Sequence, residues 1–86
     1  MELRQLLLNF KWNHRFFNEK SNIEIIIEFH NAPKVEKSIF FNQIKEIGKK
    51  FILIDIKSIP TYIPFHRIKL IRNIKRDEVF YQKKTK

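Results

Sequence analysis

Isoleucine dominates the apolar content of this chain and limits it to folds rich in β-strands. Fifteen isoleucines occur between positions 23 and 74, in short runs that polar residues interrupt. A β-branched side chain has few rotamers in a helix and packs well on a pleated sheet. From Ile23 to Phe29, Glu24 and Glu28 fall on one face and the odd-numbered apolar residues on the other. This period of two predicts a half-buried strand.

The remaining segments complete an α+β pattern with one helix. An apolar residue recurs at the spacing of a helix face at Leu3, Leu6, Leu7 and Phe10, which predicts a helix of about ten residues. Further strands are predicted at residues 35–41, 44–47, 51–56, 62–65, 69–74 and 79–82, with turns at 31–33, 48–50, 57–61 and 75–77. We therefore expect an N-terminal helix packed on a strongly bent antiparallel sheet of about five strands, with closure into a small barrel as an open alternative.

A possible internal repeat lies within the predicted sheet. Residues 39–47 and 63–71 are identical at five positions with an offset of 24. In a chain rich in isoleucine and lysine, chance identity is the alternative. If the repeat is structural, both copies are strand–bend–strand units of one shape. The polar pair at the bend is then Asn42-Gln43 in the first copy and His66-Arg67 in the second.

Length and charge suggest one basic domain with a polyanionic partner. The 86 residues predict a single domain over residues 1–82, followed by a basic tail at 83–86. The net charge of +9 is typical of nucleic-acid-binding proteins, although it also suits a merely soluble basic protein. A hydrophobic fraction of 43% excludes a disordered tail. Cysteine is absent, which excludes disulfides, and no segment predicts a membrane span, so we expect a cytoplasmic protein.

The segment from Ile63 to Ile68 holds the residues best suited to a phosphate. It places His66 beside Arg67, directly after a proline and a phenylalanine. An imidazole beside a guanidinium offers a titratable group and a fork of donors that matches phosphate oxygens. Alternatively, His66 bonds a backbone carbonyl and Arg67 pairs with Glu46 or Asp77. Nearby cations that could extend a positive strip are Arg72, Lys69 and Lys45.

Aromatic and basic residues also alternate after the predicted helix. Trp12 lies between Lys11 and the pair His14-Arg15, and two phenylalanines follow. Such a cluster can stack unpaired bases, with Lys11, His14 and Arg15 as secondary basic contacts. The alternative is that Trp12, the sole tryptophan, caps the core. If the segment is extended, only one of the two phenylalanines at 16 and 17 can point inward.

The chain resembles a small, mostly archaeal family, the RNA cyclic group end recognition domain. The motifs that carry the resemblance are Phe51-Ile52-Leu53, Ile63-Pro64-Phe65-His66-Arg67-Ile68, Ile71-Arg72 and Asp77-Glu78-Val79-Phe80, with weaker matches at Leu6-Leu7, Lys11-Trp12 and Ile25 to Phe29. Three positions depart from the family pattern: His30-Asn31 replaces an arginine, the turn at 75–77 lacks a glycine, and Phe80 replaces a tryptophan. The resemblance implies binding of RNA ends, including those that carry a 2′,3′-cyclic phosphate.

Together these observations predict an RNA-binding module that recognises a single-stranded end. His66, Arg67 and Arg72 would contact phosphate or ribose, and Trp12 and Phe65 would lie near the terminal base. An RNA-processing enzyme is a further candidate partner, and the oligomeric state stays open.

Two other functions are alternatives. One is a DNA-binding architectural protein that coats the duplex without reading sequence. The other is a cyclic-phosphate phosphodiesterase that uses two of the histidines at 14, 30 and 66 as acid and base. We expect a protein that is not an enzyme and has no metal or cofactor, because no carboxylate pair, metal-ligand spacing or glycine-rich phosphate loop occurs.

Overall fold

A computed structural model describes residues 2–29 and 35–83 of the chain. It contains one α-helix, α1 (Leu3–Trp12), and seven strands: β1 (Ile23–Phe29), β2 (Val35–Phe40), β3 (Ile44–Ile47), β4 (Phe51–Ile56), β5 (Ile59–Pro64), β6 (Ile68–Asn73) and β7 (Glu78–Gln82). Four single 3-10 turns connect them: η1 (His14–Phe16), η2 (Lys20–Asn22), η3 (Phe41–Gln43) and η4 (Phe65–Arg67). The predicted α+β class and the predicted N-terminal helix are confirmed.

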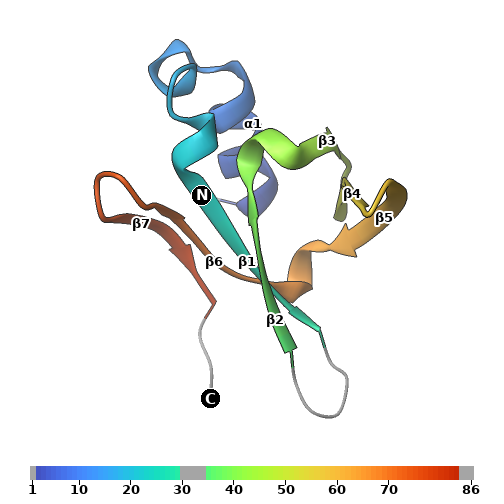
Figure 1. The fold of residues 1–86 in the computed structure, drawn as a ribbon. Coiled ribbons are helices and arrows are strands. Elements are labelled where there is room, and N and C mark those ends of the chain that lie inside the picture. The colour runs from blue at the N-terminus through green and yellow to red at the C-terminus, as the bar shows by residue number, and fades with distance from the viewer. Residues whose placement is uncertain (1, 30–34, 84–86) are drawn as a thin grey trace.

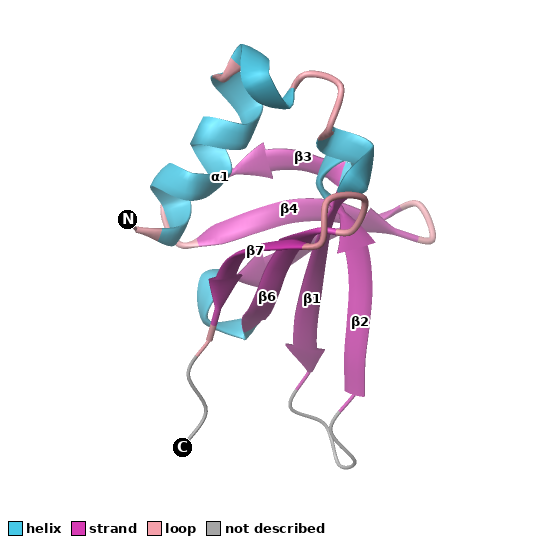
Figure 2. Ribbon diagram, turned by 90° about the vertical axis from the view of Figure 1, so that its left-hand side faces the viewer, coloured by secondary structure: helices cyan, strands magenta, loops and turns pink. Residues whose placement is uncertain are grey.

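The strands form two antiparallel sheets, and Figures 1 and 2 show them in two views at right angles. One sheet has the order β2-β1-β6-β7 and the other the order β3-β4-β5. The sequence predicts about five strands in one bent sheet, and the difference arises at η3 and η4. A 3-10 turn takes the backbone out of the extended conformation, so each predicted bend divides a strand in two and passes the chain to the other sheet.

The helix α1 lies between one edge of each sheet. In a closed barrel, these two edges would instead pair with each other as strands. Figure 1 shows α1 between β3 and β7, the facing edges of the sheets. The ring of Phe10 lies 4.9 Å from that of Phe80 on β7, and Arg4 Nε donates a 3.2 Å hydrogen bond to the carbonyl of Gly48, directly after β3. In the part of the chain that the structure describes, the strands therefore do not close into a barrel.

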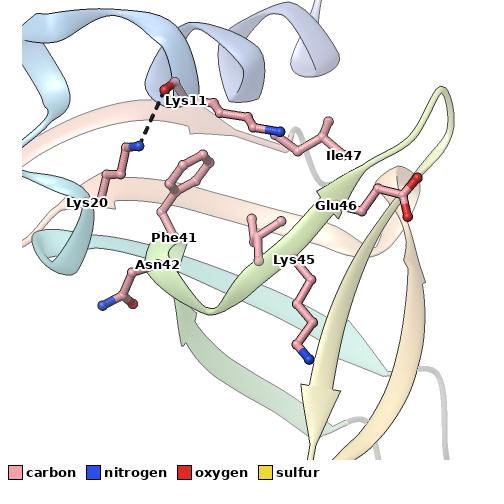
Figure 3. Close-up of a pocket in the computed structure, with 8 residues that line it drawn as sticks. Lys11, Lys20, Phe41, Asn42, Lys45, Glu46 and Ile47 are labelled. Atoms are coloured by element: carbon pink, nitrogen blue, oxygen red, sulfur yellow. Dashed lines mark hydrogen bonds between the residues drawn. The ribbon is translucent and has the colours of Figure 1, made fainter.

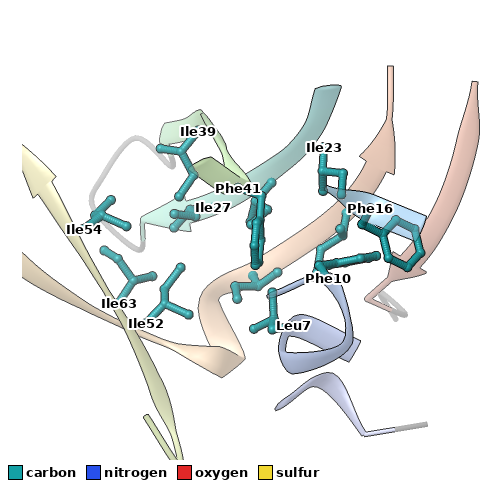
Figure 4. Packing of buried hydrophobic residues seen from close by; sticks show 13 residues of the cluster. Leu7, Phe10, Phe16, Ile23, Ile27, Ile39, Phe41, Ile52, Ile54 and Ile63 are labelled. Atoms are coloured by element: carbon teal, nitrogen blue, oxygen red, sulfur yellow. The ribbon is translucent and has the colours of Figure 1, made fainter. Parts of the chain in front are cut away.

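Both sheets and the helix contribute to a single core (Figure 4). Its buried members are Leu7, Phe10, Phe16, Ile23, Ile25, Ile27, Ile39, Phe41, Ile52, Ile54, Ile63, Ile68 and Ile71. The alternation predicted for residues 23–29 is confirmed, since the isoleucines at 23, 25 and 27 are fully buried. Among the described residues, no helix has the length and apolar character that crossing a membrane requires.

The turns show where left-handed backbone is needed. Gly48, in the turn predicted at 48–50, does not have a positive φ; a Cβ at this position would lie 2.7 Å from the ring of Phe51, so close packing is what requires glycine. Positive φ angles occur instead at Lys57 (52°), Ser58 (68°) and Asp77 (55°). The last of these lies in the turn predicted at 75–77, where a glycine would adopt the same backbone without strain.

Ser58→Gly should stabilise the domain by about 1 kcal/mol. Lys57 and Ser58 join β4 to β5 as a two-residue hairpin turn with both φ angles positive, a geometry that favours glycine at the second position. Thermal unfolding measures the effect as a higher melting temperature. The control is Ser21→Gly in η2, where φ is not positive and glycine should destabilise. An unchanged or lower melting temperature for Ser58→Gly would contradict the prediction.

Candidate functional site

Two corners of the same shape carry the chain between the sheets. η3 leads from β2 to β3, and η4 leads from β5 back to β6. The residue after each turn has nearly the same backbone angles, with φ −78° and ψ 124° at Ile44 and φ −76° and ψ 120° at Ile68. The turns begin at Phe41 and Phe65, which reproduces the offset of 24 seen in the sequence. The predicted repeat is therefore a repeat of structure.

The first corner uses a polar side chain to hold its own backbone. The side-chain oxygen of Gln43 accepts a 2.8 Å hydrogen bond from the backbone N–H of Phe40. In the second corner, Pro64 stands in the place of Phe40 and Arg67 in the place of Gln43. Proline has no N–H to satisfy, and a guanidinium has no acceptor. The second corner therefore forms without help from the side chain of Arg67.

The His-Arg pair is uncommitted within the described residues. Neither the imidazole of His66 nor the guanidinium of Arg67 makes a hydrogen bond or ion pair there. His66 is exposed and Arg67 is half-buried. The alternative pairings of Arg67 with Glu46 or Asp77 do not form, and the His66 ring does not bond a backbone carbonyl. Both side chains keep their hydrogen-bonding capacity.

Two lysines bring further positive charge to this corner. Lys83 Nζ donates a 2.7 Å hydrogen bond to the carbonyl of His66, and the Lys83 backbone N–H donates to the carbonyl of Lys69 at 2.8 Å. The carbonyl of Lys50 accepts from the backbone N–H of Phe65 at 2.9 Å. Lys83, predicted to begin a tail, thus continues the pairing of β7 with β6, while residues 84–86 lie outside the described residues. We call Lys50, His66, Arg67 and Lys83 the η4 corner.

An open apolar hollow adjoins the η4 corner. It is lined by Lys50, Phe51, Tyr62, Pro64 and His66. The ring of Tyr62 is 62% exposed and meets the ring of Phe51 edge to face, with centroids 4.8 Å apart. A flat apolar surface with an imidazole and an ammonium at its rim suits a nucleobase next to a phosphate.

Phe51, Tyr62 and Lys50 line this hollow but were not predicted from the sequence as site residues. The available signal was the alternation in β4 and β5, in which Ile52, Ile54 and Ile63 face the core and the residues between them must face outward. Which outward residues lie side by side depends on strand register, which the sequence does not show.

Two prolines fit into the edge strand that carries the hollow. The bond from the Phe65 N–H to the Lys50 carbonyl sets which residues of β5 pair with β4. Successive residues of β5 point their backbone N–H alternately toward and away from β4. Pro60 and Pro64 occupy positions whose N–H would point away from β4, so the pairing of β4 with β5 loses no hydrogen bond. β5 therefore begins at Ile59, and the loop predicted at 57–61 shortens to a two-residue turn.

Three other cations of the predicted site are already paired with carboxylates. The pairs are Arg72–Glu24, with 2.7 Å between Nε and Oε1, Lys45–Asp55, with 2.6 Å between Nζ and Oδ2, and Lys69–Glu36. The hydrogen bond from Ser38 and the Arg72 guanidinium hold the pKa of Glu24 below its ordinary value. The Glu36 carboxylate raises the pKa of Lys69. A phosphate would have to displace a carboxylate at each of these cations, unlike at Arg67.

The aromatic residues of the predicted site do not gather at one place. Trp12 is 70% exposed, so the expectation that it caps the core is wrong. Phe16 is buried and Phe17 is exposed, although the segment is a 3-10 turn and not the extended backbone on which the prediction depended. Phe65 is half-buried and packs against the core. Figures 1 and 2 both place the end of α1 at the top of the molecule and the turn between β5 and β6 in its lower half, so Trp12 and Phe65 do not flank one base.

A second hollow lies between the end of α1 and β3. Its volume is about 240 Å³, and Figure 3 shows the side chains that line it. They include Lys11, Lys20, Phe41, Asn42 and Lys45. The structure thus groups Lys45 with the basic contacts predicted after the helix rather than with the η4 corner. We call this hollow the α1–β3 groove.

The described histidines lie on different elements. His14 belongs to η1 at the end of α1, where its ring lies 4.8 Å from that of Phe17, and His66 belongs to η4. His30, and with it the departure from the family pattern at positions 30 and 31, lies outside the described residues. Phe80 on β7 packs its ring against those of Phe10 and Phe16, with centroids 4.9 and 6.0 Å away.

These features describe a small basic α+β domain with a His-Arg pair at a corner between its two sheets. The chain is 32% identical over 82 residues to UPF0248 protein MJ1316 of Methanocaldococcus jannaschii, which covers 95% of this chain and 94% of that protein. It is 33% identical over 81 residues to a UPF0248 protein of Methanococcus vannielii, covering 94% and 90%. The chain belongs to the UPF0248 family. No protein-family model and no solved structure matches it.

Proposed function

We propose that this protein binds the end of a single-stranded RNA at the η4 corner. The observation that carries the proposal is the contrast between the two repeated corners. Gln43 is engaged in holding η3, whereas Pro64 removes the corresponding N–H, and Arg67 makes no hydrogen bond or ion pair within residues 2–29 and 35–83. A half-buried guanidinium with unused donors, beside a free imidazole, is a ready partner for phosphate oxygens.

The hollow beside the corner supports an RNA end over a duplex. The exposed ring of Tyr62, held edge to face by Phe51, offers a stacking surface only to a base that has left a helix. In the proposed complex Arg67 donates to two phosphate oxygens, His66 donates to a third or to the ribose, and Lys50 supplies charge at the rim. The resemblance to an end-recognising family points to a 2′,3′-cyclic phosphate as the favoured terminus. Binding of RNA would place the protein in the cytoplasm, with an RNA-processing enzyme as a candidate partner.

The test compares three versions of one short RNA that differ only at the 3′ end, which is a 2′,3′-cyclic phosphate, a 3′-phosphate or a 3′-hydroxyl. We expect the cyclic phosphate and the 3′-phosphate to bind roughly 10- to 150-fold more tightly than the 3′-hydroxyl, because one charge-assisted hydrogen bond is worth about 1.5–3 kcal/mol. A titration of labelled RNA by fluorescence anisotropy measures the three affinities. Equal affinity for all three ends would overturn the proposal.

The same titration separates the two alternatives. With three to five phosphate contacts, log K should fall with log salt at a slope of about −2 to −3.5 for a single strand. Tighter binding of a DNA duplex of equal length would favour the architectural function. Conversion of the cyclic end to a new monoester during incubation would favour the phosphodiesterase.

A further inference from the structure

Exposed aromatic rings and cations gather at the end of α1, away from the η4 corner. Trp12 is 70% exposed and Phe17 is 56% exposed. Lys11 Nζ lies 5.1 Å from the centre of the Trp12 ring, and Lys20 Nζ lies 5.3 Å from the centre of the Phe17 ring. A large apolar ring costs free energy when it stays in water, so two exposed rings within six residues of the chain, each beside a cation, mark a surface that binds something.

The α1–β3 groove begins beside these rings. Lys20 Nζ donates a 3.3 Å hydrogen bond to the carbonyl of Lys11, which holds the ammonium at the mouth of the groove (Figure 3). Phe41 and Asn42 of η3 supply an apolar wall and an amide. The carboxylate of Glu46 lies at the opposite end of the groove from Lys20 in Figure 3. The end near α1 is therefore positive and partly apolar.

This chemistry selects an unpaired nucleobase with its phosphate. A flat aromatic face stacks on any base, an ammonium pairs with the adjoining phosphate, and an amide can bond a base edge. An acidic peptide would use the lysines but would leave the exposed indole of Trp12 without a flat partner. We infer that the end of α1 and the α1–β3 groove form a second contact for single-stranded nucleic acid, which takes an internal nucleotide and is independent of how the strand ends.

Trp12 itself provides the readout, because it is the sole tryptophan of the chain. We expect a short oligouridylate with a 3′-hydroxyl to quench its fluorescence with saturation. Uridine 2′,3′-cyclic phosphate, which would fill only the η4 corner, should leave the emission unchanged. An oligouridylate that binds without changing the emission would overturn the inference. Quenching by the cyclic mononucleotide with the midpoint of the oligomer would also overturn it, since one site would then explain both ligands.

The affinity of single variants for a labelled oligouridylate shows which residues form the contact. Trp12→Ala and Lys20→Gln should each weaken binding about tenfold, the scale of one stacked base. Both residues lie outside the core, and circular dichroism checks the fold. Lys37→Gln on β2 removes the same charge from an exposed position away from the groove and should change affinity less than twofold. Equal losses of affinity from Lys20→Gln and Lys37→Gln would mean a diffuse electrostatic attraction rather than a site. If polyglutamate displaced the labelled oligouridylate as well as unlabelled oligouridylate does, the surface would bind an acidic peptide instead.

The second contact can be distinguished from the η4 corner. A wild-type protein that binds all three RNA ends equally would refute the proposed end recognition and leave the quenching result intact. A Trp12→Ala protein that keeps the preference among ends while losing affinity for every strand is the outcome expected if both sites exist.

Discussion

Phe10→Ala should destabilise the domain by about 3–5 kcal/mol, the cost of removing a fully buried ring from a core that cannot collapse around the gap. The ring of Phe10 meets three others edge to face, those of Phe16, Phe41 and Phe80, with centroids 4.9, 5.7 and 4.9 Å away. It thereby joins α1 to η1, to the η3 corner and to β7. For 86 residues a free energy of unfolding of about 4–13 kcal/mol is ordinary. If the wild type lies near the lower end of this range, the loss would unfold a large fraction of the protein.

Urea unfolding followed by circular dichroism measures the effect of Phe10→Ala. The matched control is Phe17→Ala, which removes the same ring from a position that is 56% exposed and should cost less than about 1 kcal/mol. Similar unfolding midpoints for the two variants would show that α1 is not packed into the core in the way described.

Arg67→Ala should weaken binding of a phosphate-bearing RNA end by about 2–3 kcal/mol, or roughly 30- to 150-fold. It removes both the charge and the fork of donors. Arg67→Lys keeps the charge but loses the bidentate geometry, and about 1–2 kcal/mol should be lost. Melting temperatures should stay near that of the wild type, because Arg67 has no hydrogen bond or ion pair within the described residues.

Arg72 provides the comparison for Arg67. Its guanidinium is bound to Glu24 at 2.7 Å, so Arg72→Lys should lower stability more than it lowers RNA affinity. Two measurements on the two lysine variants, affinity for an RNA end and melting temperature, therefore distinguish a binding role from a structural one. An Arg67→Lys protein that binds ends normally but melts early would reverse the assignment and make the corner structural.

Local patterns in the sequence were enough to predict most of the secondary structure. The helix and the strands at 23–29, 44–47 and 51–56 agree with the structure because their periodicity or β-branched content acts over neighbouring residues. The two predicted bends are 3-10 turns, but no local pattern showed that they divide seven strand segments between two sheets rather than bending about five strands of one sheet. The similarity of residues 39–47 to 63–71 was the better guide, since it identified two corners of one shape.

The candidate site was predicted in part. His66 and Arg67 were found because the two residues are adjacent in sequence and differ chemically from the apolar residues around them. Arg72, Lys69 and Lys45 were predicted as free cations, but each faces a carboxylate on another strand. Pairing across strands depends on register and strand order, and these are decided by the packing of the whole sheet.

Composition and local patterns are enough to predict a small, basic, strand-rich domain with one helix and a His-Arg pair suited to phosphate, because these properties arise from interactions between near neighbours. Three further features come from the folded arrangement. Tyr62 and Phe51 lie beside the His-Arg pair, Arg67 has no hydrogen bond or ion pair within the described residues while Gln43 has one, and Trp12 at the end of α1 is exposed far from the pair. These facts depend on contacts between residues distant along the chain, whose geometry exists only once both sheets have closed on the helix.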